Sequence, residues 1–456
     1  MMRSLSLAEL AQACGVAPPT APAVFSGVTT DSRQVKPGDL FVALRGERFD
    51  AHDFLADVQR AGAAAALVER LDAAVALPQL AVPDAVLALA QLAALNRAQF
   101  NGTVIGLTGS AGKTTTKEMI AAILAQSGKP LVTAGNLNNH IGVPLTLLRL
   151  APEHDCAVIE MGASAMGEIR YLTQLVRPAV ALVTTVEAAH IEGFGSIENI
   201  ARGKREIFEG LAAGGTAVIN LDNRWTASWR DALLRDHRVL AFSTVQAADV
   251  WASDIAQDAG GLRFVLHACG QALPLRLAFI GRHNVGNALA AAACCLGAGL
   301  PLQQVVAGLQ AAQPYKGRLQ SRAGINGCLV IDDSYNANPA AVRMAVDALL
   351  ACEGDRILVL GDMAELGPEA LALHAEAGRD AKAAGITTLL VTGELSRATA
   401  DGFGAGAEYF PDWQSLAASC RSRATNNTVF LIKGSRSAGM DRVADVLAGT
   451  GSTAAC

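Results

Sequence analysis

A glycine-rich turn between an expected strand and an expected helix constrains this chain more than any other feature. The apolar run 103–108 is typical of a strand, and the run 115–125 is typical of a helix. Between them stands Gly109-Ser-Ala-Gly-Lys-Thr-Thr115. Backbone N–H groups in such a turn, together with the positive end of the helix dipole, surround phosphates. The order of strand, turn and helix therefore predicts a P-loop on a parallel α/β sheet, with a bound nucleoside triphosphate.

The match to the P-loop pattern departs at one position. The strict motif has glycine where this chain has Leu107, although Gly106 and Gly109 flank it. The alternative is an ordinary turn that happens to contain Gly-Lys-Thr, but the flanking elements favour the P-loop. In a P-loop, the lysine reaches the terminal phosphates and the next hydroxyl binds Mg²⁺. The residues expected to surround the triphosphate are Gly109, Ser110, Ala111, Gly112, Lys113, Thr114 and Thr115.

Composition and charge limit the classes of protein that fit. The 456 residues are 51% hydrophobic and 17% charged, with a formal net charge of −5 and no basic run. Nine cysteines without a Cys-x-x-Cys pair suit free thiols in a reducing compartment. At the N-terminus, Glu9 interrupts any signal-peptide core, and Ser6 is expected to cap a short amphipathic helix. We expect a cytoplasmic α/β protein without a membrane span or a nucleic-acid partner.

The pattern of apolar runs predicts three domains. Residues 1–99 form a small α/β domain that ends in a long helix before Asn101-Gly102. Residues 100–314 alternate strands and helices, which predicts a mostly parallel sheet, with antiparallel strands over 239–277. Residues 315–456 repeat the alternation as a Rossmann-like, doubly wound domain. The last domain lacks Gly-x-Gly-x-x-Gly, so the sequence gives no reason to expect NAD.

Three charged residues of the central domain have both an ordinary and a functional interpretation. Glu160 ends a strand, where an acid is commonly a cap, but beside a P-loop it is placed to bind Mg²⁺. His190 follows another strand, and an isolated histidine is usually structural or exposed. Lys204 lies in a basic segment whose default interpretation is a solvated helix face.

Several polar segments are candidates for binding small molecules. Residues 133–144 contain three closely spaced asparagines, typical of a surface loop or of amide recognition of a polar substrate. Asn284 and Asn287 begin an alanine-rich helix, where they either cap the helix or face a purine. The segments 332–339, 361–367 and 433–436 follow strands of the last domain. Ligands of doubly wound sheets bind at the carboxyl ends of strands, so these segments are expected to form a site.

Together these motifs resemble the Mur ligases, ATP-dependent enzymes that build the peptide of bacterial peptidoglycan. The resemblance spans the whole chain and is most specific at 333–339, Asp-Ser-Tyr-Asn-Ala-Asn-Pro, and at 361–367, Gly-Asp-Met-Ala-Glu-Leu-Gly. These two segments are similar to those of the member that joins D-alanyl-D-alanine to UDP-N-acetylmuramoyl-tripeptide. Another Mur ligase or a folate polyglutamate synthase remains the alternative enzyme. A nucleotide-gated switch is disfavoured because the chain lacks Asn-Lys-x-Asp.

The resemblance implies how ATP and two Mg²⁺ ions are bound. It adds to the P-loop the ATP contacts Asn284, Asn287, Arg318 and Asp332. It gives the metal ligands as Thr114, Glu160, His190 and Lys204, and the catalytic residues as Lys113, Lys204, His190 and Arg318. It also implies a CO₂-derived carbamate on Lys204, since an ammonium repels a cation whereas a carbamate offers an anionic oxygen. The adjacent Arg205 leaves open which residue of this segment is modified.

The resemblance also implies the substrates and the reaction. The UDP-linked tripeptide is assigned to domain 1–99 and to Ser32, Arg33, Asn136, Asn138 and Asn139. The dipeptide is assigned to Tyr335, Asn336, Ser435 and Arg436. The γ-phosphoryl group of ATP would pass to the tripeptide carboxylate, and the dipeptide amine would then displace phosphate. We expect the protein to be a monomer.

Overall fold

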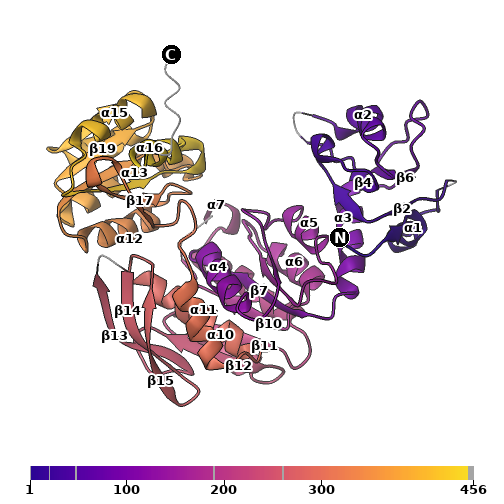
Figure 1. Ribbon diagram of the computed structural model, residues 1–456, viewed down its shortest axis with the longest axis horizontal. Helices are drawn as coiled ribbons and strands as arrows, with labels where there is room; N and C mark the ends of the chain where they lie inside the picture. Colours follow the sequence, from indigo (N-terminus) through magenta and orange to yellow (C-terminus); the bar gives the residue numbers. More distant parts are fainter. Residues whose placement is uncertain (1, 20, 47–48, 188–190, 259–260, 450–456) are drawn as a thin grey trace. The chain divides into compact units, whose positions relative to one another are not determined.

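The chain folds into β-sheets covered by helices, and Figure 1 labels many of these elements. This computed structural model describes residues 2–19, 21–46, 49–187, 191–258 and 261–449. Contacts divide the chain into two compact units, each of which is described by itself. The first contains Met1–Phe242 and Ala290–Val305, and the second contains Ser243–Leu289 and Val306–Cys456.

The first helix begins as the sequence predicts. Helix α1 (Leu7–Cys14) is capped by Ser6, whose side chain accepts a hydrogen bond from the backbone N–H of Glu9. Glu9 in turn accepts from the Ser6 backbone, which completes a capping box. Leu7 and Leu10 are buried on the inner face of this helix, which makes it amphipathic. Strand β1 (Leu5–Ser6) precedes this helix and β2 (Val24–Phe25) follows it, and the two strands pair antiparallel.

A small parallel sheet makes up the rest of the N-terminal part. Its order is β3-β4-β5-β6, and every neighbouring pair is parallel. Alternate residues of β4 enter different cores: Leu40 and Val42 pack in one, and Phe41 in the other. The elements are β3 (Gly27–Thr29), β4 (Asp39–Val42), α2 (Leu55–Arg60), β5 (Ala65–Val68), β6 (Gln79–Ala81) and α3 (Ala85–Ala98). The predicted long helix and strands are confirmed here, with small shifts at their ends.

Six parallel strands of the first unit carry the P-loop. Their order is β12-β11-β10-β7-β9-β8, so the P-loop strand β7 lies between β10 and β9. The strands are β7 (Thr103–Thr108), β8 (Pro130–Val132), β9 (Cys156–Glu160), β10 (Val180–Val183), β11 (Thr216–Asn220) and β12 (Arg238–Ser243). The helices are α4 (Lys113–Leu124), α5 (Gly142–Leu147), α6 (Glu168–Val176), α7 (Ile191–Phe194), α8 (Ile197–Arg205) and α9 (Thr226–Leu233).

The expectation of antiparallel strands over 239–277 is wrong for the first of them. Strand β12 pairs parallel with β11, because α9 forms a crossover between the two. The three strands that follow are antiparallel, as predicted: β13 (Val250–Asp258) pairs with β14 (Gly261–Ala268), and β14 with β15 (Gln271–Leu277). The predicted helix after them is α10 (His283–Gly297), and α11 (Leu302–Ala311) follows.

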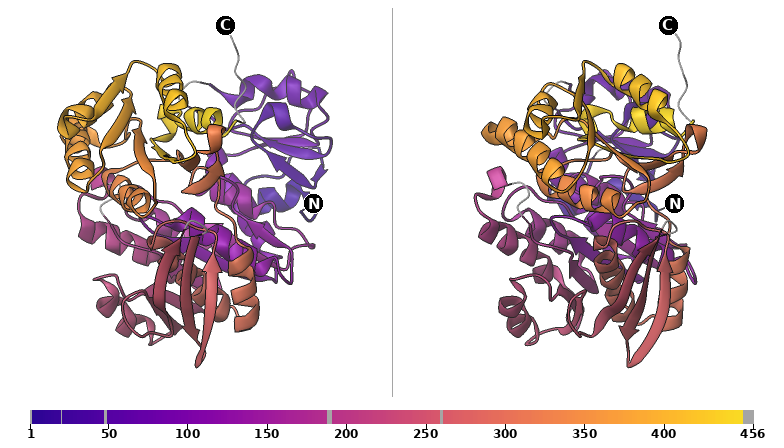
Figure 2. Two further views of the ribbon diagram at one scale, coloured as in Figure 1. Left: turned by 60° about the vertical axis from the view of Figure 1, so that its left-hand side comes forward. Right: turned by 90° about the vertical axis from the view of Figure 1, so that its left-hand side faces the viewer.

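The C-terminal sheet is doubly wound, as predicted. Its order is β16-β17-β21-β18-β19-β20, parallel except for β16. Alternate residues of β18 enter opposite cores: Leu358 packs with α12 and α13, and Val359 with α15 and α16. Figure 2 shows the orange and yellow helices on both sides of this sheet.

The elements of this sheet differ from the sequence prediction in three places. The apolar pattern predicts strands over 330–332, 357–360, 387–391 and 428–433 and helices over 339–352, 368–384, 413–422 and 440–448. These are present with small shifts at their ends, whereas β16, α14 and β20 are not predicted. The strands are β16 (Gln320–Ala323), β17 (Leu329–Asp333), β18 (Asp355–Leu360), β19 (Thr388–Thr392), β20 (Ala407–Phe410) and β21 (Thr428–Lys433). The helices are α12 (Pro339–Leu350), α13 (Ala370–Ala383), α14 (Ser396–Phe403), α15 (Trp413–Arg423) and α16 (Asp441–Leu447).

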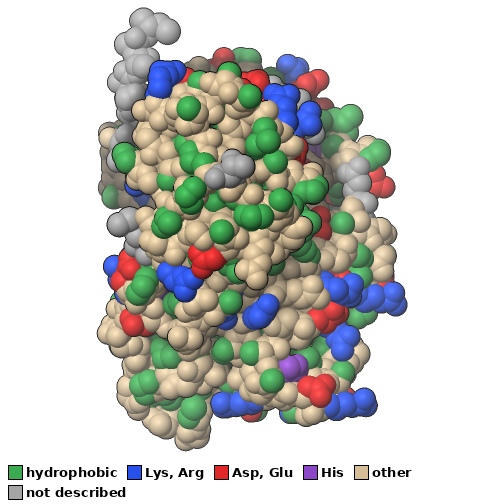
Figure 3. Space-filling model, turned by 90° about the vertical axis from the view of Figure 1, so that its right-hand side faces the viewer, with side chains coloured by type: hydrophobic (Ala, Val, Ile, Leu, Met, Phe, Trp, Pro, Cys, Tyr) green, Lys and Arg blue, Asp and Glu red, His purple; other side chains and the backbone are tan. Residues whose placement is uncertain are grey.

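The surface carries charges of both signs. On the face drawn in Figure 3, the coloured Lys and Arg side chains are interspersed with Asp and Glu side chains. The eight cysteines among the described residues are all free thiols. Among the described residues, no helix has both the length and the apolar character needed to cross a bilayer.

Candidate nucleotide and metal site

The P-loop has a backbone conformation that requires glycine. Gly109 has φ +151°, and a Cβ there would lie 1.9 Å from Oγ1 of Thr184. Gly112 has φ +77° and stands at the N-cap of α4, where no side chain caps the helix. The first N–H groups of an uncapped helix point toward whatever the loop encloses, and they attract anions. The predicted P-loop geometry is therefore present, and it fits a phosphate group.

The segment after β10 fixes the position of the loop. The backbone N–H of Ser110 donates to Thr185 O at 2.9 Å, and Thr184 Oγ1 donates to Ala111 O at 2.6 Å. Ser110 Oγ donates to Glu187 O at 3.0 Å. Lys113 lies within the loop, with its Nζ 2.8 Å from Gly109 O. The loop is thus held in shape by the segment that follows β10, and a rigid loop is what an anion site needs.

Glu160 lies at the P-loop threonine, as the sequence predicts. Its carboxylate is buried at the end of β9 and accepts a hydrogen bond from Thr114 Oγ1 at 3.2 Å. Its other oxygen accepts from Asn138 Nδ2 at 2.8 Å. The Lys117 ammonium lies 3.9 Å from the same carboxylate. A hydroxyl next to one carboxylate is the donor set with which proteins hold Mg²⁺ beside phosphates, so these two residues fit that ion.

Among the residues that the structure describes, no larger group of metal-binding side chains competes with this pair. Within the described ranges, no three His, Cys, Asp or Glu side chains gather as a metal site would require. Mg²⁺ bound to phosphates typically takes only one or two carboxylates from the protein and keeps several waters.

Lys204 is buried, contrary to the default interpretation of its segment. Ser196 caps helix α8, and the helix turns Lys204 inward while Arg202 and Arg205 stay exposed. The Lys204 Nζ donates to Ala163 O at 3.2 Å and lies 5.3 Å from the centre of the Phe194 ring. Among the cationic side chains of this helix, Lys204 is therefore the one that faces the interior.

The surroundings of Lys204 favour a neutral amine. Burial, and to a smaller extent the positive charge of Lys113, lowers the pKa of Lys204 to about 7. A neutral amine is the form that reacts with CO₂, so the site fits the carbamate that the sequence comparison implies. The second predicted ligand of this metal, His190, lies outside the described residues.

The residues assigned to the UDP-linked substrate have varied surroundings. Ser32 and Arg33 begin a short 3₁₀ helix capped by Asp31, and Arg33 is exposed. Hydrogen bonds from Arg33 hold the pKa of Asp31 at about 2. In the loop after β8, Asn136 is exposed, and Asn139 Oδ1 accepts from the backbone N–H of Gly142. Asn138, as described above, contacts Glu160.

Three strand-end segments of the last sheet lie on neighbouring strands, as predicted. Strand β21 lies between β17 and β18, so their carboxyl ends share one edge. A buried ion pair joins two of them: Lys433 Nζ lies 2.6 Å from Asp333 Oδ2. Asp332 accepts from Ser334 Oγ at 2.6 Å and lies 3.4 Å from Arg322. The predicted ATP contact Asp332 is thus already hydrogen-bonded within the protein.

The four residues assigned to the dipeptide differ in their accessibility. Ser435 is buried, and its Oγ accepts from the backbone N–H of Ala364 at 2.6 Å, which ties β21 to the segment after β18. Asn336 and Arg436 are exposed. Tyr335 is half-buried and stacks under Arg318, whose guanidinium lies 4.1 Å from the ring centre. Tyr335 therefore positions the arginine predicted to reach the phosphates.

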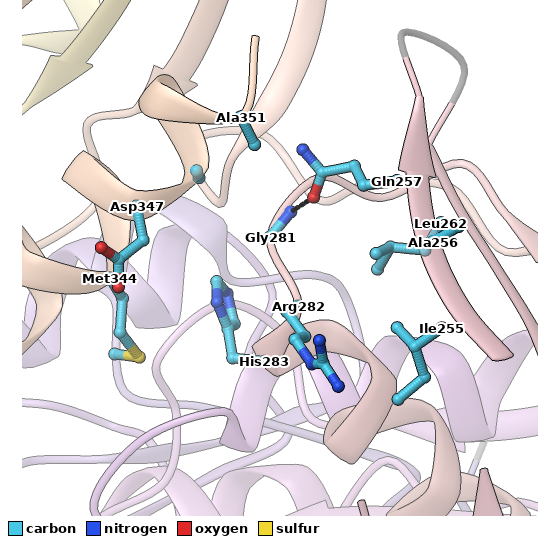
Figure 4. A pocket seen from close by; sticks show the side chains of 11 residues that line it. Ile255, Ala256, Gln257, Leu262, Gly281, Arg282, His283, Met344, Asp347 and Ala351 are labelled. Carbon is cyan, nitrogen blue, oxygen red and sulfur yellow. Dashed lines mark hydrogen bonds between the residues drawn. The ribbon is translucent and has the colours of Figure 1, made fainter. Parts of the chain in front are cut away.

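The asparagines assigned to adenine begin α10. Asn287 Nδ2 donates to Asn284 Oδ1 at 2.9 Å, and Asn284 Nδ2 donates to Ile280 O at 2.7 Å. The residues just before them, Arg282 and His283, line a cavity of about 310 Å³ shown in Figure 4. Desolvation lowers the pKa of His283.

Sequence reasoning assigned no role to four titratable residues near these sites. Lys117 lies one helical turn after the P-loop lysine, in the segment Thr-Thr-Thr-Lys-Glu. This spacing indicates that the two side chains lie on the same face of the helix. The Asp333–Lys433 pair joins residues that are far apart in the chain, and no sequence pattern connects them. His283 precedes the predicted site residue Asn284, but no sequence pattern indicated a function for His283 itself.

Comparison with known families gives one consistent result. A profile described as "Mur ligase middle domain" matches residues 107–295. Profiles described as "Mur ligase, glutamate ligase domain" and "Mur ligase family, catalytic domain" match 317–436 and 24–97. The three matches together cover most of the chain.

Individual relatives are similar over their full lengths. The UDP-N-acetylmuramoyl-tripeptide–D-alanyl-D-alanine ligase of Escherichia coli is 45% identical over 98% of this chain and 99% of its own. A crystal structure of MurF from Acinetobacter baumannii superposes with a TM-score of 0.89 at 37% identity, covering 98% of this chain and 99% of that one. MurF ligase from Thermotoga maritima in complex with ADP gives 0.81 at 29% identity, covering 93% and 97%.

Proposed function

The chain belongs to the Mur ligase family, and on that premise we propose that it joins D-alanyl-D-alanine to UDP-N-acetylmuramoyl-tripeptide with ATP. The full-length identity to a ligase of that name carries the proposal. The P-loop, the buried Glu160 and the buried Lys204 supply the matching chemistry. The same identity favours this reaction over those of other Mur ligases and of folate polyglutamate synthases.

The chemical problem is that a carboxylate has no good leaving group. An oxygen of the tripeptide carboxylate attacks the γ-phosphorus of ATP, and the bond from that phosphorus to ADP breaks. The resulting acyl phosphate has phosphate as a leaving group. The dipeptide amine attacks the acyl carbon, loses a proton, and phosphate departs as the amide forms. Two anions must meet in the first step, so positive charge at the phosphates determines its rate.

The P-loop residues supply part of that charge. The P-loop residues Gly109 to Thr115 would surround the phosphates, and Lys113 would exchange its carbonyl contact for a stronger one to a phosphate oxygen. Thr114 and Glu160 would hold one Mg²⁺ ion, and Lys204 with His190 a second. When bound, Mg²⁺ neutralises charge on the phosphoryl oxygens as a Lewis acid.

Lys204 would serve the metal as a carbamate. Its neutral Nζ attacks CO₂, a proton leaves, and an anionic oxygen donor replaces a cation. The buried position and the pKa of about 7 support this assignment, because they leave about half of the amine unprotonated at neutral pH. Exposed Arg205 adds positive charge on the outer side of the helix and is not the modified residue.

The last domain would complete the site. Arg318, fixed by Tyr335, would reach the γ-phosphate, and Asp332 the ribose, while Asn284 and Asn287 face adenine. Ser32, Arg33, Asn136, Asn138 and Asn139 bind the UDP-linked substrate, and Tyr335, Asn336, Ser435 and Arg436 the dipeptide. The domains span 1–99, 100–314 and 315–456. The protein works as a monomer in the cytoplasm, a compartment that its free thiols suit.

Phosphate release tests the proposal. Purified protein with ATP and Mg²⁺ is given UDP-N-acetylmuramoyl-tripeptide, with and without D-alanyl-D-alanine. We expect phosphate and amide product in equal amounts, and both only when the dipeptide is present. Single amino acids, including glutamate, serve as control acceptors. Turnover with one of those instead would assign the chain to another branch of the family.

A further inference from the structure

Lys117 is a buried cation for which the proposed reaction has no role. Its side chain is 1% exposed, on α4 one turn after the P-loop lysine. Lysine is almost never buried without a specific partner, because removing an ammonium from water is costly. The reason for the charge must therefore lie in what surrounds it.

Oxygens of Thr133, Glu118 and Glu160 lie near the Lys117 ammonium. Its Nζ donates to Thr133 O at 2.8 Å, lies 3.1 Å from Glu118 Oε1, and lies 3.9 Å from Glu160 Oε2. Glu160 is itself buried, and its neutral partners Thr114 and Asn138 donate hydrogen bonds without balancing its charge. Lys117 is the cation that balances this carboxylate in the nucleotide-free protein.

The contact to Glu160 is the longest of the three. If a metal ion took over the charge of Glu160, the ammonium would keep the Thr133 carbonyl and the Glu118 carboxylate. The arrangement therefore tolerates a second cation at Glu160 without leaving Lys117 unpaired. A positive charge this close nevertheless repels that second cation.

We propose that Lys117 is a positioning residue whose ammonium balances the charge of Glu160 until a metal ion binds there. It offsets the charge of the carboxylate before the nucleotide arrives, and it weakens the binding of a divalent cation on its own. The metal then binds tightly only together with the negative phosphates, whose charge offsets that of Lys117. This rests on the proposed assignment of Glu160 to the metal.

Metal binding without nucleotide tests the proposal. Lys117→Gln removes the charge but retains a donor for the Thr133 carbonyl. Free Mn²⁺ is measured by electron paramagnetic resonance in the nucleotide-free protein. We expect Lys117→Gln to bind Mn²⁺ about ten-fold or more tightly than the unchanged protein. Adding Glu160→Gln to this variant should remove the gain. Lys117→Arg, which keeps the charge, should bind Mn²⁺ as weakly as the unchanged protein.

A matched control tests whether tighter Mn²⁺ binding depends on the balance of charge at Glu160 or follows any change of charge near Lys117. Glu118→Gln removes the other carboxylate near the same ammonium and should not tighten Mn²⁺ binding. Lys117→Met, which fills the space with an apolar chain, replaces Lys117→Gln if the latter does not fold. If the folded variant, Lys117→Gln or Lys117→Met, binds Mn²⁺ no more tightly than the unchanged protein, the proposal is overturned. Lys117 then has a purely structural role. Because no ligase substrate is present, failure of the proposed reaction would be seen separately, in the phosphate assay.

Discussion

Replacing Gly109 with alanine should disable nucleotide binding while leaving most of the fold intact. An added Cβ would lie 1.9 Å from Thr184 Oγ1 and 3.1 Å from the Thr185 backbone nitrogen. Real Cβ atoms keep at least 3.0 Å from other heavy atoms, so the loop must move by about 1 Å. The φ of +151° adds about 1–3 kcal/mol of strain, because side-chain-bearing residues rarely adopt it.

These two effects have different consequences. The strain should lower the free energy of unfolding by about 1–3 kcal/mol. The displacement should lower nucleotide affinity and kcat/KM for ATP by about 10²-fold, the usual effect of misplacing a binding group by about 1 Å. Calorimetric titration with ADP and thermal unfolding measure the two separately.

Two further variants identify the cause of the loss. Gly15 also has a positive φ, of +65°, but nothing lies within 4 Å of its added Cβ. Gly15→Ala should therefore cost stability without changing ADP affinity. Thr184→Ala removes the clashing oxygen but also its bond to Ala111 O, so adding it to Gly109→Ala should recover affinity only in part. ADP affinity within three-fold of the unchanged protein in Gly109→Ala would refute the loop geometry described above.

Four other predictions concern two lysines and a helix cap. Lys113→Ala should abolish phosphate release with an unchanged circular dichroism spectrum, and normal turnover would remove the P-loop lysine from the mechanism. Lys204→Ala should be nearly inactive and partly rescued by short carboxylic acids, whereas full activity would exclude a carbamate. At constant dissolved CO₂, a ¹³C carbamate signal should grow as pH rises through about 7, because the Lys204 amine is neutral above its lowered pKa. A signal that does not depend on pH, or that persists in Lys204→Arg, would contradict this prediction. Ser6→Ala should lower the free energy of unfolding by about 1 kcal/mol in denaturant titrations through loss of the cap on α1, and an unchanged midpoint would show that the capping box contributes nothing.

Local sequence patterns predicted the elements that carry the nucleotide site. The strand β7, the turn and α4 were expected because apolar periodicity and glycine placement act over a few residues. The Ser6 cap was predictable for the same reason. The strand-end segments were predicted to share an edge because parallel strands of a doubly wound sheet align their carboxyl ends.

The direction of β12, helix α14 and strand β20 were beyond such patterns. Pairing direction depends on whether a crossover helix intervenes, and α9 has too polar a sequence to stand out. Helix α14 contains Gly402 near its end, and β20 has only four residues, so neither gives a clear period.

The chemistry of the site depended on contacts between distant segments. Glu160 could be placed near the P-loop from its strand, but its bond from Asn138 and its neighbour Lys117 arise from tertiary packing. The burial of Lys204 beside Phe194 was hidden because the flanking arginines make the segment look solvent-exposed. A helix with one inward-facing lysine and two outward-facing arginines is distinguished only by its packing.

The fate of the carboxylate oxygens tests the central claim most directly. UDP-N-acetylmuramoyl-tripeptide labelled with ¹⁸O in its terminal carboxylate is converted with ATP and D-alanyl-D-alanine, and the released phosphate is analysed by mass spectrometry. Activation by phosphoryl transfer predicts one ¹⁸O atom in each phosphate and one in the new amide. Unlabelled phosphate accompanying amide formation would contradict it.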